Sequence, residues 1–247
     1  MRISDLLSYL FCPPRCAACG ELIGLDFLSS PLCKRCMERL SEEEAAVCRK
    51  CNKQMKSCTC SEDSVMKVGC LFHSKLALYH GGLLDKAVNG IVFEMKRSSD
   101  KRLYSFLADR IVGSSKNVID RARALCGAEK VVFTYVPRSD SALIKYGHDQ
   151  AELLARAISE RYSGEVVRIA DRRRGANGKM KSLSYEDRFT EAEASYVQSS
   201  EASSVKDAFV IIVDDVVTSG ASVVSLARMA MRNKARGFGV ISVGISK

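Results

Sequence analysis

The chain has 247 residues, of which 47% are hydrophobic, and a formal net charge of +9. This length and apolar content permit one sizeable core with a small module beside it. No apolar run is long enough to cross a bilayer and the N-terminus has no secretory signal pattern, so we expect a soluble, cytoplasmic protein. The basic charge suits an anionic partner, either a phosphorylated small molecule or a nucleic acid, but a solvated surface without a dedicated partner explains it equally well.

Cysteines are concentrated near the N-terminus. Nine of the eleven lie between Cys12 and Cys60, in a segment with too few apolar residues to fold unaided. Closely spaced pairs in a chain without a secretory signal are typical of metal ligands. The predicted zinc ligands are Cys16, Cys19, Cys33 and Cys36 at one site, and Cys48, Cys51, Cys58 and Cys60 at a second. Four thiolates suit zinc, whose binding releases about 10–16 kcal/mol in small peptides, enough to fold a segment without a core.

The second quartet is less regular than the first. Its last pair has one intervening residue instead of two, and Cys70 could replace one member. At the first site, Cys12 could compete as a ligand. Reduced free thiols are the alternative to metal binding, and a closed four-cysteine site is usually structural.

Beyond the cysteines, hydrophobic periodicity alternates between helix and strand. An amphipathic helix is expected from residue 82 onward, and residues 171–204 show little periodicity and predict a long mobile segment. The later elements are expected as strands at 131–136, 166–169, 209–213 and 240–245, and as helices at 149–162 and 222–232. This order predicts an α/β fold with a buried, mainly parallel sheet.

A buried strand runs directly into a small-residue turn and a helix at residues 210–222. A helix N-terminus presents free backbone N–H groups and the positive end of the helix dipole, which together can hold a phosphate. Thr218, Ser219 and Ser222 add hydroxyl donors, and Gly220 lets the backbone approach the ligand closely. The pattern predicts a phosphate-binding loop.

Two carboxylates, Asp214 and Asp215, stand between the strand and this turn, where they can accept hydrogen bonds from vicinal ribose hydroxyls. With them the stretch resembles the phosphoribosyl-pyrophosphate signature of type I phosphoribosyltransferases, with serine at two positions where threonine is common. The resemblance implies that the two acids are the catalytic pair and bind the ribose 2′ and 3′ hydroxyls. The residues that would hold the 5′-phosphate are Thr218, Ser219, Gly220, Ala221 and Ser222.

The whole chain resembles the ComF/GntX family, in which a cysteine-rich zinc module is joined to such a transferase domain. The family has a lysine on the linking helix, here Lys96. It opens the first long helix of the transferase domain with Arg-Gly-Phe-Asn-Gln-Ala-Glu-Leu-Leu-Ala, and residues 145–155 match its glycine, its glutamine and the residues that follow. Pro137 and Arg138 fall where the family has its pyrophosphate-side turn.

The resemblance implies a type I phosphoribosyltransferase fold, a mainly parallel sheet flanked by helices, with a small N-terminal zinc-ribbon module. We expect the zinc-ribbon module at residues 1–62, a linking helical segment at 63–129 and the phosphoribosyltransferase-like domain at 130–247, with a mobile hood at 171–204. The basic hood residues expected to face pyrophosphate are Arg174, Lys181 and Arg188. The hood departs from the family pattern, because Met180 stands where glutamine is usual and Glu191 where asparagine is.

The implied function is a ComF-like protein that binds phosphoribosyl pyrophosphate with Mg²⁺ and transfers the phosphoribosyl group to an unidentified acceptor, with a link to DNA uptake in natural competence. The alternative is a non-catalytic, zinc-dependent protein that binds single-stranded DNA or a DNA-processing partner and keeps the fold as a ribose-phosphate module. The hood departures favour this alternative. Against it, Phe27 is the only aromatic residue between positions 12 and 60, so a platform for stacking bases is nearly absent.

Overall fold

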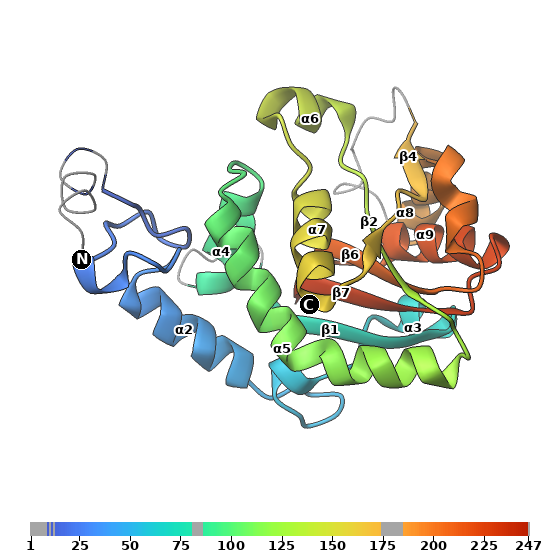
Figure 1. Ribbon diagram of the computed structural model, residues 1–247, viewed down its shortest axis with the longest axis horizontal. Helices are drawn as coiled ribbons and strands as arrows, with labels where there is room; N and C mark the ends of the chain where they lie inside the picture. The colour runs from blue at the N-terminus through green and yellow to red at the C-terminus, as the bar shows by residue number, and fades with distance from the viewer. Residues whose placement is uncertain (1–8, 10, 12, 81–85, 174–184, 247) are drawn as a thin grey trace.

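A computed structural model describes residues 9, 11, 13–80, 86–173 and 185–246 (Figure 1). Five strands form the main sheet in the order β1-β7-β6-β2-β3, and every neighbouring pair is parallel. They are β1 (Cys70–Tyr79), β2 (Val131–Tyr135), β3 (Glu165–Val166), β6 (Phe209–Val217) and β7 (Gly237–Ser246). A separate antiparallel pair joins β4 (Ala170–Arg172) to β5 (Tyr196–Gln198). The predicted α/β class with a parallel sheet is confirmed.

Helices flank this sheet. They are α2 (Lys34–Ala45), α3 (Asp63–Lys67), α4 (Ala87–Met95), α5 (Lys101–Leu125), α6 (Asp140–Tyr146), α7 (Gln150–Tyr162), α8 (Tyr185–Ser195) and α9 (Ala221–Arg232), with short 3-10 turns at Leu25–Phe27, Met55–Ser57 and Ser200–Val205. None of the helices in the described ranges is long and apolar enough to span a membrane. Figure 1 shows α2 and the residues before it extending to one side of the body that holds the sheet.

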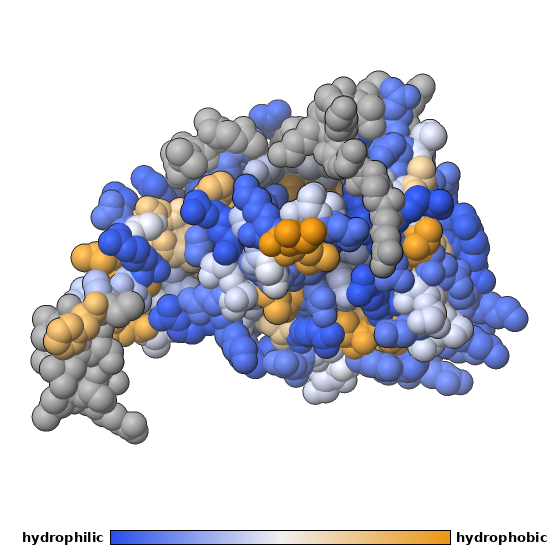
Figure 2. Space-filling view, turned by 90° about the horizontal axis from the view of Figure 1, so that it is seen from above, coloured by the Kyte–Doolittle hydropathy of each residue, from blue (hydrophilic) through white to orange (hydrophobic). Residues whose placement is uncertain are grey.

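Two hydrophobic cores lie on opposite faces of the sheet, because successive side chains of a strand point to opposite sides. Phe133 and Ile211 pack in one core with α4, α5 and α7. Val132 and Ile212 pack in the other with α9 and the segment from α8 to residue 205. On the face seen in Figure 2 the surface is mostly hydrophilic, and apolar side chains form small separate groups.

Most of the predicted elements are present. The strands expected at 131–136, 209–213 and 240–245 correspond to β2, β6 and β7, and the helices expected at 149–162 and 222–232 correspond to α7 and α9. The helix expected from residue 82 begins at Ala87 as α4, because its N-cap Lys86 has an extended backbone; residues 81–85 lie outside the described part.

The strand predicted at 166–169 is wrong in its extent. Only Glu165–Val166 pairs with β2, and the chain then leaves the main sheet. Beyond that point the backbone finds other partners: the N–H of Arg168 donates to Glu201, and the carbonyl of Ile169 accepts from Ser199. These bonds satisfy the backbone groups that a longer strand would have paired.

The segment 171–204 has more regular structure than its sequence predicts. It contains α8, β5 and most of the turn at Ser200–Val205, and Ala192 and Tyr196 are buried against α9. The segment has too few apolar residues for its sequence to show a helical or strand periodicity. Residues 174–184 lie outside the described part, and with them Arg174, Met180 and Lys181.

The segment 63–129, predicted as a helical linker, also supplies an edge strand of the main sheet. Strand β1 pairs with β7 along most of its length. Three consecutive polar residues, His73, Ser74 and Lys75, are buried in this strand, so its sequence lacks the apolar pattern of a core strand. Cys70 belongs to this strand, where its thiol donates to the carbonyl of Phe72.

The cysteine-rich segment docks tightly on α4. The Glu43 carboxylate accepts from the N–H groups of Ala87 (2.7 Å) and Val88 (3.0 Å), which caps the N-terminus of that helix. One turn along, a Cβ on Gly90 would overlap the carbonyl oxygen of Ala18. Glycine at this position allows the two backbones to touch.

We therefore expect Gly90→Ala to lower the free energy of unfolding by about 1–3 kcal/mol, the usual effect of overpacking. Gly113→Ala is the matched control, because Gly113 lies inside α5 with open space around it. That change should raise stability by up to about 1 kcal/mol through helix propensity. Urea unfolding followed by circular dichroism compares the two variants, and equal stabilities would contradict the tight docking.

Candidate functional site

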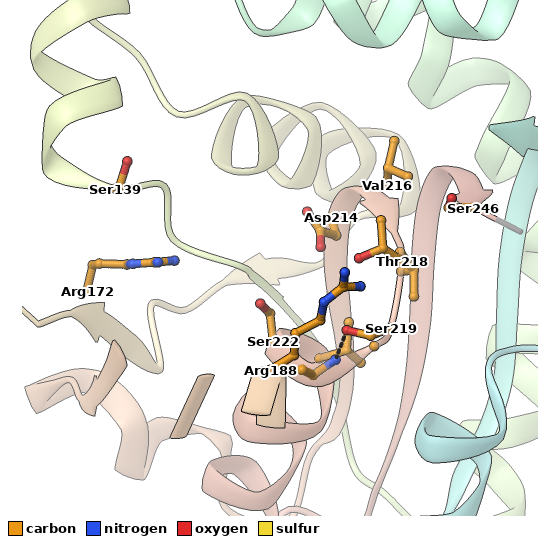
Figure 3. A pocket seen from close by; sticks show the side chains of 13 residues that line it. Ser139, Arg172, Arg188, Asp214, Val216, Thr218, Ser219, Ser222 and Ser246 are labelled. Atoms are coloured by element: carbon orange, nitrogen blue, oxygen red, sulfur yellow. Dashed lines mark hydrogen bonds between the residues drawn. The ribbon is translucent and has the colours of Figure 1, made fainter. Parts of the chain in front are cut away.

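A pocket of about 580 Å³ opens at the carboxyl ends of β6 and β7 (Figure 3). Asp214 and the continuous run of residues 216–223 form much of its wall. All five predicted phosphate-binding residues belong to this run. The remaining lining residues are Ser139 after β2, Arg172 in β4, Arg188 in α8 and Ser246 at the end of β7.

The turn at residues 218–222, hereafter the phosphate loop, has the geometry of an anion site. Gly220 adopts a left-handed conformation (φ +77°) and is the N-cap of α9. The N–H groups of the first helical turn therefore lie at the end of the helix that borders the pocket. Hydroxyl groups of Thr218, Ser219 and Ser222 line the same wall. Backbone donors, hydroxyls and the helix dipole together can hold a phosphate group.

The two acids point to different places, because neighbouring residues of a strand face opposite sides. Asp214 lines the pocket. Asp215 is almost fully buried and lies on the other side, where its Oδ2 is 3.1 Å from Nζ of Lys96 at the end of α4. The two acids therefore lie in different surroundings. Asp214 faces the pocket, and Asp215 is paired with Lys96.

Burial and mutual repulsion set the electrostatics of these acids. Burial raises the pKa of Asp214 well above its ordinary value, and the neighbouring Asp215 carboxylate raises it further. Burial opposes the charged form of Lys96, but the attraction of Asp215 outweighs it and the pKa of Lys96 is raised. A carboxylate held in such surroundings is typical of functional sites.

Two arginines bring positive charge to the pocket. Arg172 donates to the hydroxyl of Tyr196 (3.0 Å), which in turn donates to Ser222 of the phosphate loop (3.1 Å). Arg188 extends toward the phosphate loop from α8, and Arg172 and Ser139 lie across the pocket from it (Figure 3). An ion pair between Arg228 and Glu193 joins α9 to α8, the helix that carries Arg188.

Pro137 and Arg138 line a neighbouring pocket of about 320 Å³ instead. The Arg138 guanidinium donates to the carbonyls of His148 (3.1 Å) and Lys96 (2.9 Å), so these hydrogen bonds direct it to backbone groups. The two pockets share Arg172. Ser139, the residue that follows the predicted pyrophosphate-side turn, lines the larger pocket.

Residues that the sequence analysis missed at this site are Ser139, Ser246 and the bridging Tyr196. For two of them a signal was present, because Ser139 follows β2 and Ser246 is the last residue of β7, and parallel strands end at one edge of a sheet. Tyr196 carries no such signal, since β5 lies outside the main sheet.

The two cysteine quartets are assembled as predicted. In each group the four sulfur atoms lie within 4.8 Å of one another. Cys19 and Cys33 are 3.8 Å apart at the first site, and Cys51 and Cys58 are 3.5 Å apart at the second. A tetrahedral zinc ion with bonds of about 2.3 Å separates its sulfurs by roughly 3.8 Å. Both clusters could hold zinc, and the second contains Cys60, not Cys70.

The same backbone turn forms half of each cluster. The N–H of Gly20 donates to the carbonyl of Cys16, and the N–H of Asn52 donates to the carbonyl of Cys48, both at 2.8 Å. Gly20 and Asn52 have positive φ, the left-handed conformation that closes such a turn. These residues were not singled out from the sequence, although each directly follows a Cys-x2-Cys pair.

The thiols of the second cluster differ in how readily they ionise. Burial opposes ionisation of Cys48, but hydrogen bonds from the amides of Cys51 and Lys50 and from the thiols of Cys58 and Cys51 outweigh it and lower the pKa of Cys48 to about 6. Burial raises the pKa of Cys60 to about 12. A thiolate is the form that binds zinc. Cys12, the competing ligand considered for the first cluster, lies outside the described part.

No family model matches this sequence, and no curated protein matches it either.

Proposed function

We propose that this chain is a ComF-like protein of the ComF/GntX family with a type I phosphoribosyltransferase fold. In this proposal it binds phosphoribosyl pyrophosphate and transfers the phosphoribosyl group to an acceptor. The observation that carries the proposal is the pocket wall formed by Asp214 and residues 216–223, where a strand, an acid, a left-handed glycine and a helix N-terminus meet. Arg172 and Arg188, which also line the pocket, add the charge that a second phosphorylated group needs.

Each part of the pocket has a role in this reaction. The phosphate loop binds the 5′-phosphate, and Asp214 accepts hydrogen bonds from the ribose hydroxyls. Arg172 and Arg188 offset the negative charge that develops on pyrophosphate as it leaves, which stabilises the transition state electrostatically. Mg²⁺, when bound with the substrate, would neutralise further leaving-group charge. Lys96 and Asp215 form an ion pair on the other side of the strand, so the two charges offset each other there.

Zinc in the two cysteine clusters is proposed to be structural, because four thiolates leave no open position for a substrate. The family resemblance adds a cytoplasmic location and a link to DNA uptake. The alternative is a non-catalytic protein that uses the pocket to hold a ribose phosphate while another surface contacts single-stranded DNA or a DNA-processing partner.

Isothermal titration of phosphoribosyl pyrophosphate with Mg²⁺ into the zinc-loaded protein tests the proposal. We expect micromolar binding, and weaker binding of ribose 5-phosphate and of pyrophosphate alone, because each fills only part of the pocket. Single-stranded DNA titrated under the same conditions, at two salt concentrations, tests the alternative. The transferase proposal fails if the folded, zinc-loaded chain binds none of the three phosphorylated ligands.

A further inference from the structure

The phosphate loop rests on a short helix that directly follows the second cysteine cluster. Helix α3 begins at Asp63, three residues after the last cysteine ligand, and Ser64 donates from its hydroxyl to the carbonyl oxygen of Ser219 (2.8 Å). Val65 is fully buried, and a Cβ on Gly220 would overlap its side chain. Two consecutive residues of α3 therefore touch two consecutive residues of the loop.

The contact between Ser64 and Ser219 fixes the orientation of one peptide group. The carbonyl of Ser219 and the N–H of Gly220 belong to the same trans peptide unit and point in opposite directions. Because the carbonyl is turned toward Ser64 behind the loop, the N–H of Gly220 is turned away from α3, toward the side on which the pocket lies. A donor aimed in this way serves an anion in the pocket.

The cysteine cluster reaches α3 through a segment fastened to β1. Lys75, a lysine only 2% exposed, donates from Nζ to the carbonyl of Cys58 (3.2 Å), to its sulfur (3.3 Å) and to the carbonyl of Cys60. The ammonium group therefore joins the last two cysteine ligands to the main sheet. Its charge also complements the negative charge of a four-thiolate metal site.

A second link joins the same segment to β1 and β7. The N–H of His73 donates to the carbonyl of Thr59 (3.0 Å), and the His73 ring lies between the hydroxyls of Ser61 (2.9 Å) and Ser242 (2.7 Å). Ser242 is the β7 residue paired with Asp214. A chain of buried contacts thus connects the cluster, the sheet end and the pocket.

We propose that Ser64 and Val65 are positioning residues for the phosphate loop, and that metal bound at the second cysteine cluster holds them in place. The metal ties Cys48 and Cys51 to Cys58 and Cys60, so its loss releases the segment that leads into α3. The loop amides then lose their support and the pocket loses affinity for a phosphate group. The ligand named here rests on the proposed function, whereas the coupling between cluster and loop does not.

Hydrogen exchange at the loop amides, followed by mass spectrometry without any ligand, tests the coupling directly. We expect Ser64→Ala to speed exchange across residues 218–222 by about fivefold to tenfold, the effect of one lost hydrogen bond. Ser64→Thr keeps a hydroxyl and should restore protection. Ser114→Ala is the matched control, because it removes a hydroxyl-to-carbonyl bond of 3.0 Å on α5. Unchanged exchange in Ser64→Ala would overturn the proposal.

The metal's part is tested by comparing the two clusters. Cys51→Ser weakens the second cluster and should speed exchange of the loop amides, whereas Cys19→Ser weakens the first and should leave them unchanged; zinc content is measured for both. Coupling of binding free energies is reciprocal, so ribose 5-phosphate should raise the zinc affinity of the second cluster only, as measured by equilibrium competition with a chelator. Equal effects of the two cysteine changes would refute the coupling. Faster loop exchange in Cys51→Ser together with no ligand binding by the wild type would refute the proposed function instead.

Discussion

Asp214→Asn is expected to stabilise the folded protein while it weakens ligand binding. The ionised carboxylate of Asp214 is costly in the fold, because burial and Asp215 raise its pKa well above the ordinary value. Asparagine removes that charge and keeps an oxygen that can accept from the N–H of Asp215, now at 2.8 Å. We expect a gain of about 1 kcal/mol in the free energy of unfolding at pH 7, and a loss of about 1.5–3 kcal/mol in binding of phosphoribosyl pyrophosphate.

The gain should depend on pH in a definite direction. A raised pKa in the folded state means that Asp214 contributes its stability below the unfolded value of about 3.9 and loses it as pH rises through the folded value. The stability difference between Asp214→Asn and wild type therefore grows with pH. Urea unfolding at pH 6 and pH 8 measures this, since more acid conditions would also strip metal from thiolates. A difference that shrinks with rising pH would contradict the assignment.

Asp215→Asn is the matched control, because it changes the adjacent carboxylate. It leaves Lys96 without its partner, and should destabilise the protein by about 1 kcal/mol. The loss stays below that of a fully buried pair because the Lys96 side chain is 40% exposed. Opposite signs for two neighbouring Asp→Asn changes would identify Asp214 as the residue whose charge is kept for function at the expense of stability. Equal signs would remove that distinction.

Lys75→Met is expected to weaken metal binding at the second cluster by about 10- to 100-fold, as is usual when a group that supports the ligands is lost. Methionine fills a similar volume but supplies no donor to the carbonyls of Cys58 and Cys60. The change would also remove the Lys75 ammonium group, which lies 3.3 Å from the Cys58 sulfur. Zinc content and competition with a chelating dye measure the effect.

Lys50→Met provides the comparison for this change. Lys50 also lies beside the second cluster, and its Nζ donates to the carbonyl of Ser61 (3.1 Å) and to Asp63 (2.8 Å). Its side chain is 54% exposed, so water replaces these bonds and we expect little change in zinc affinity. If Lys50→Met and Lys75→Met release zinc equally easily, burial of the Lys75 ammonium has no special importance for the cluster.

Local signals in the sequence were strong where one short segment forms a complete unit. The two cysteine quartets are such units, since a turn and its ligands lie within a few residues of one another, and both are assembled as predicted. The strand, acid and helix at residues 209–232 form another, because backbone donors at a helix N-terminus need no distant partner. Buried apolar runs likewise predicted β2, β6 and β7.

Other features depend on contacts between segments that are far apart in the chain, and the structure was needed to find them. Strand β1 is a strand because β7 pairs with it, and its Lys75 is tolerated in the interior because carbonyls from the cysteine segment surround it. Alternation along β6 separates Asp214 from Asp215, but only the position of α4 places Lys96 beside the latter. Local patterns were enough to predict the two cysteine clusters and the strand, turn and helix around the phosphate loop. Which side chains meet across the fold depended on packing between residues far apart in the chain, a contribution that no local pattern records.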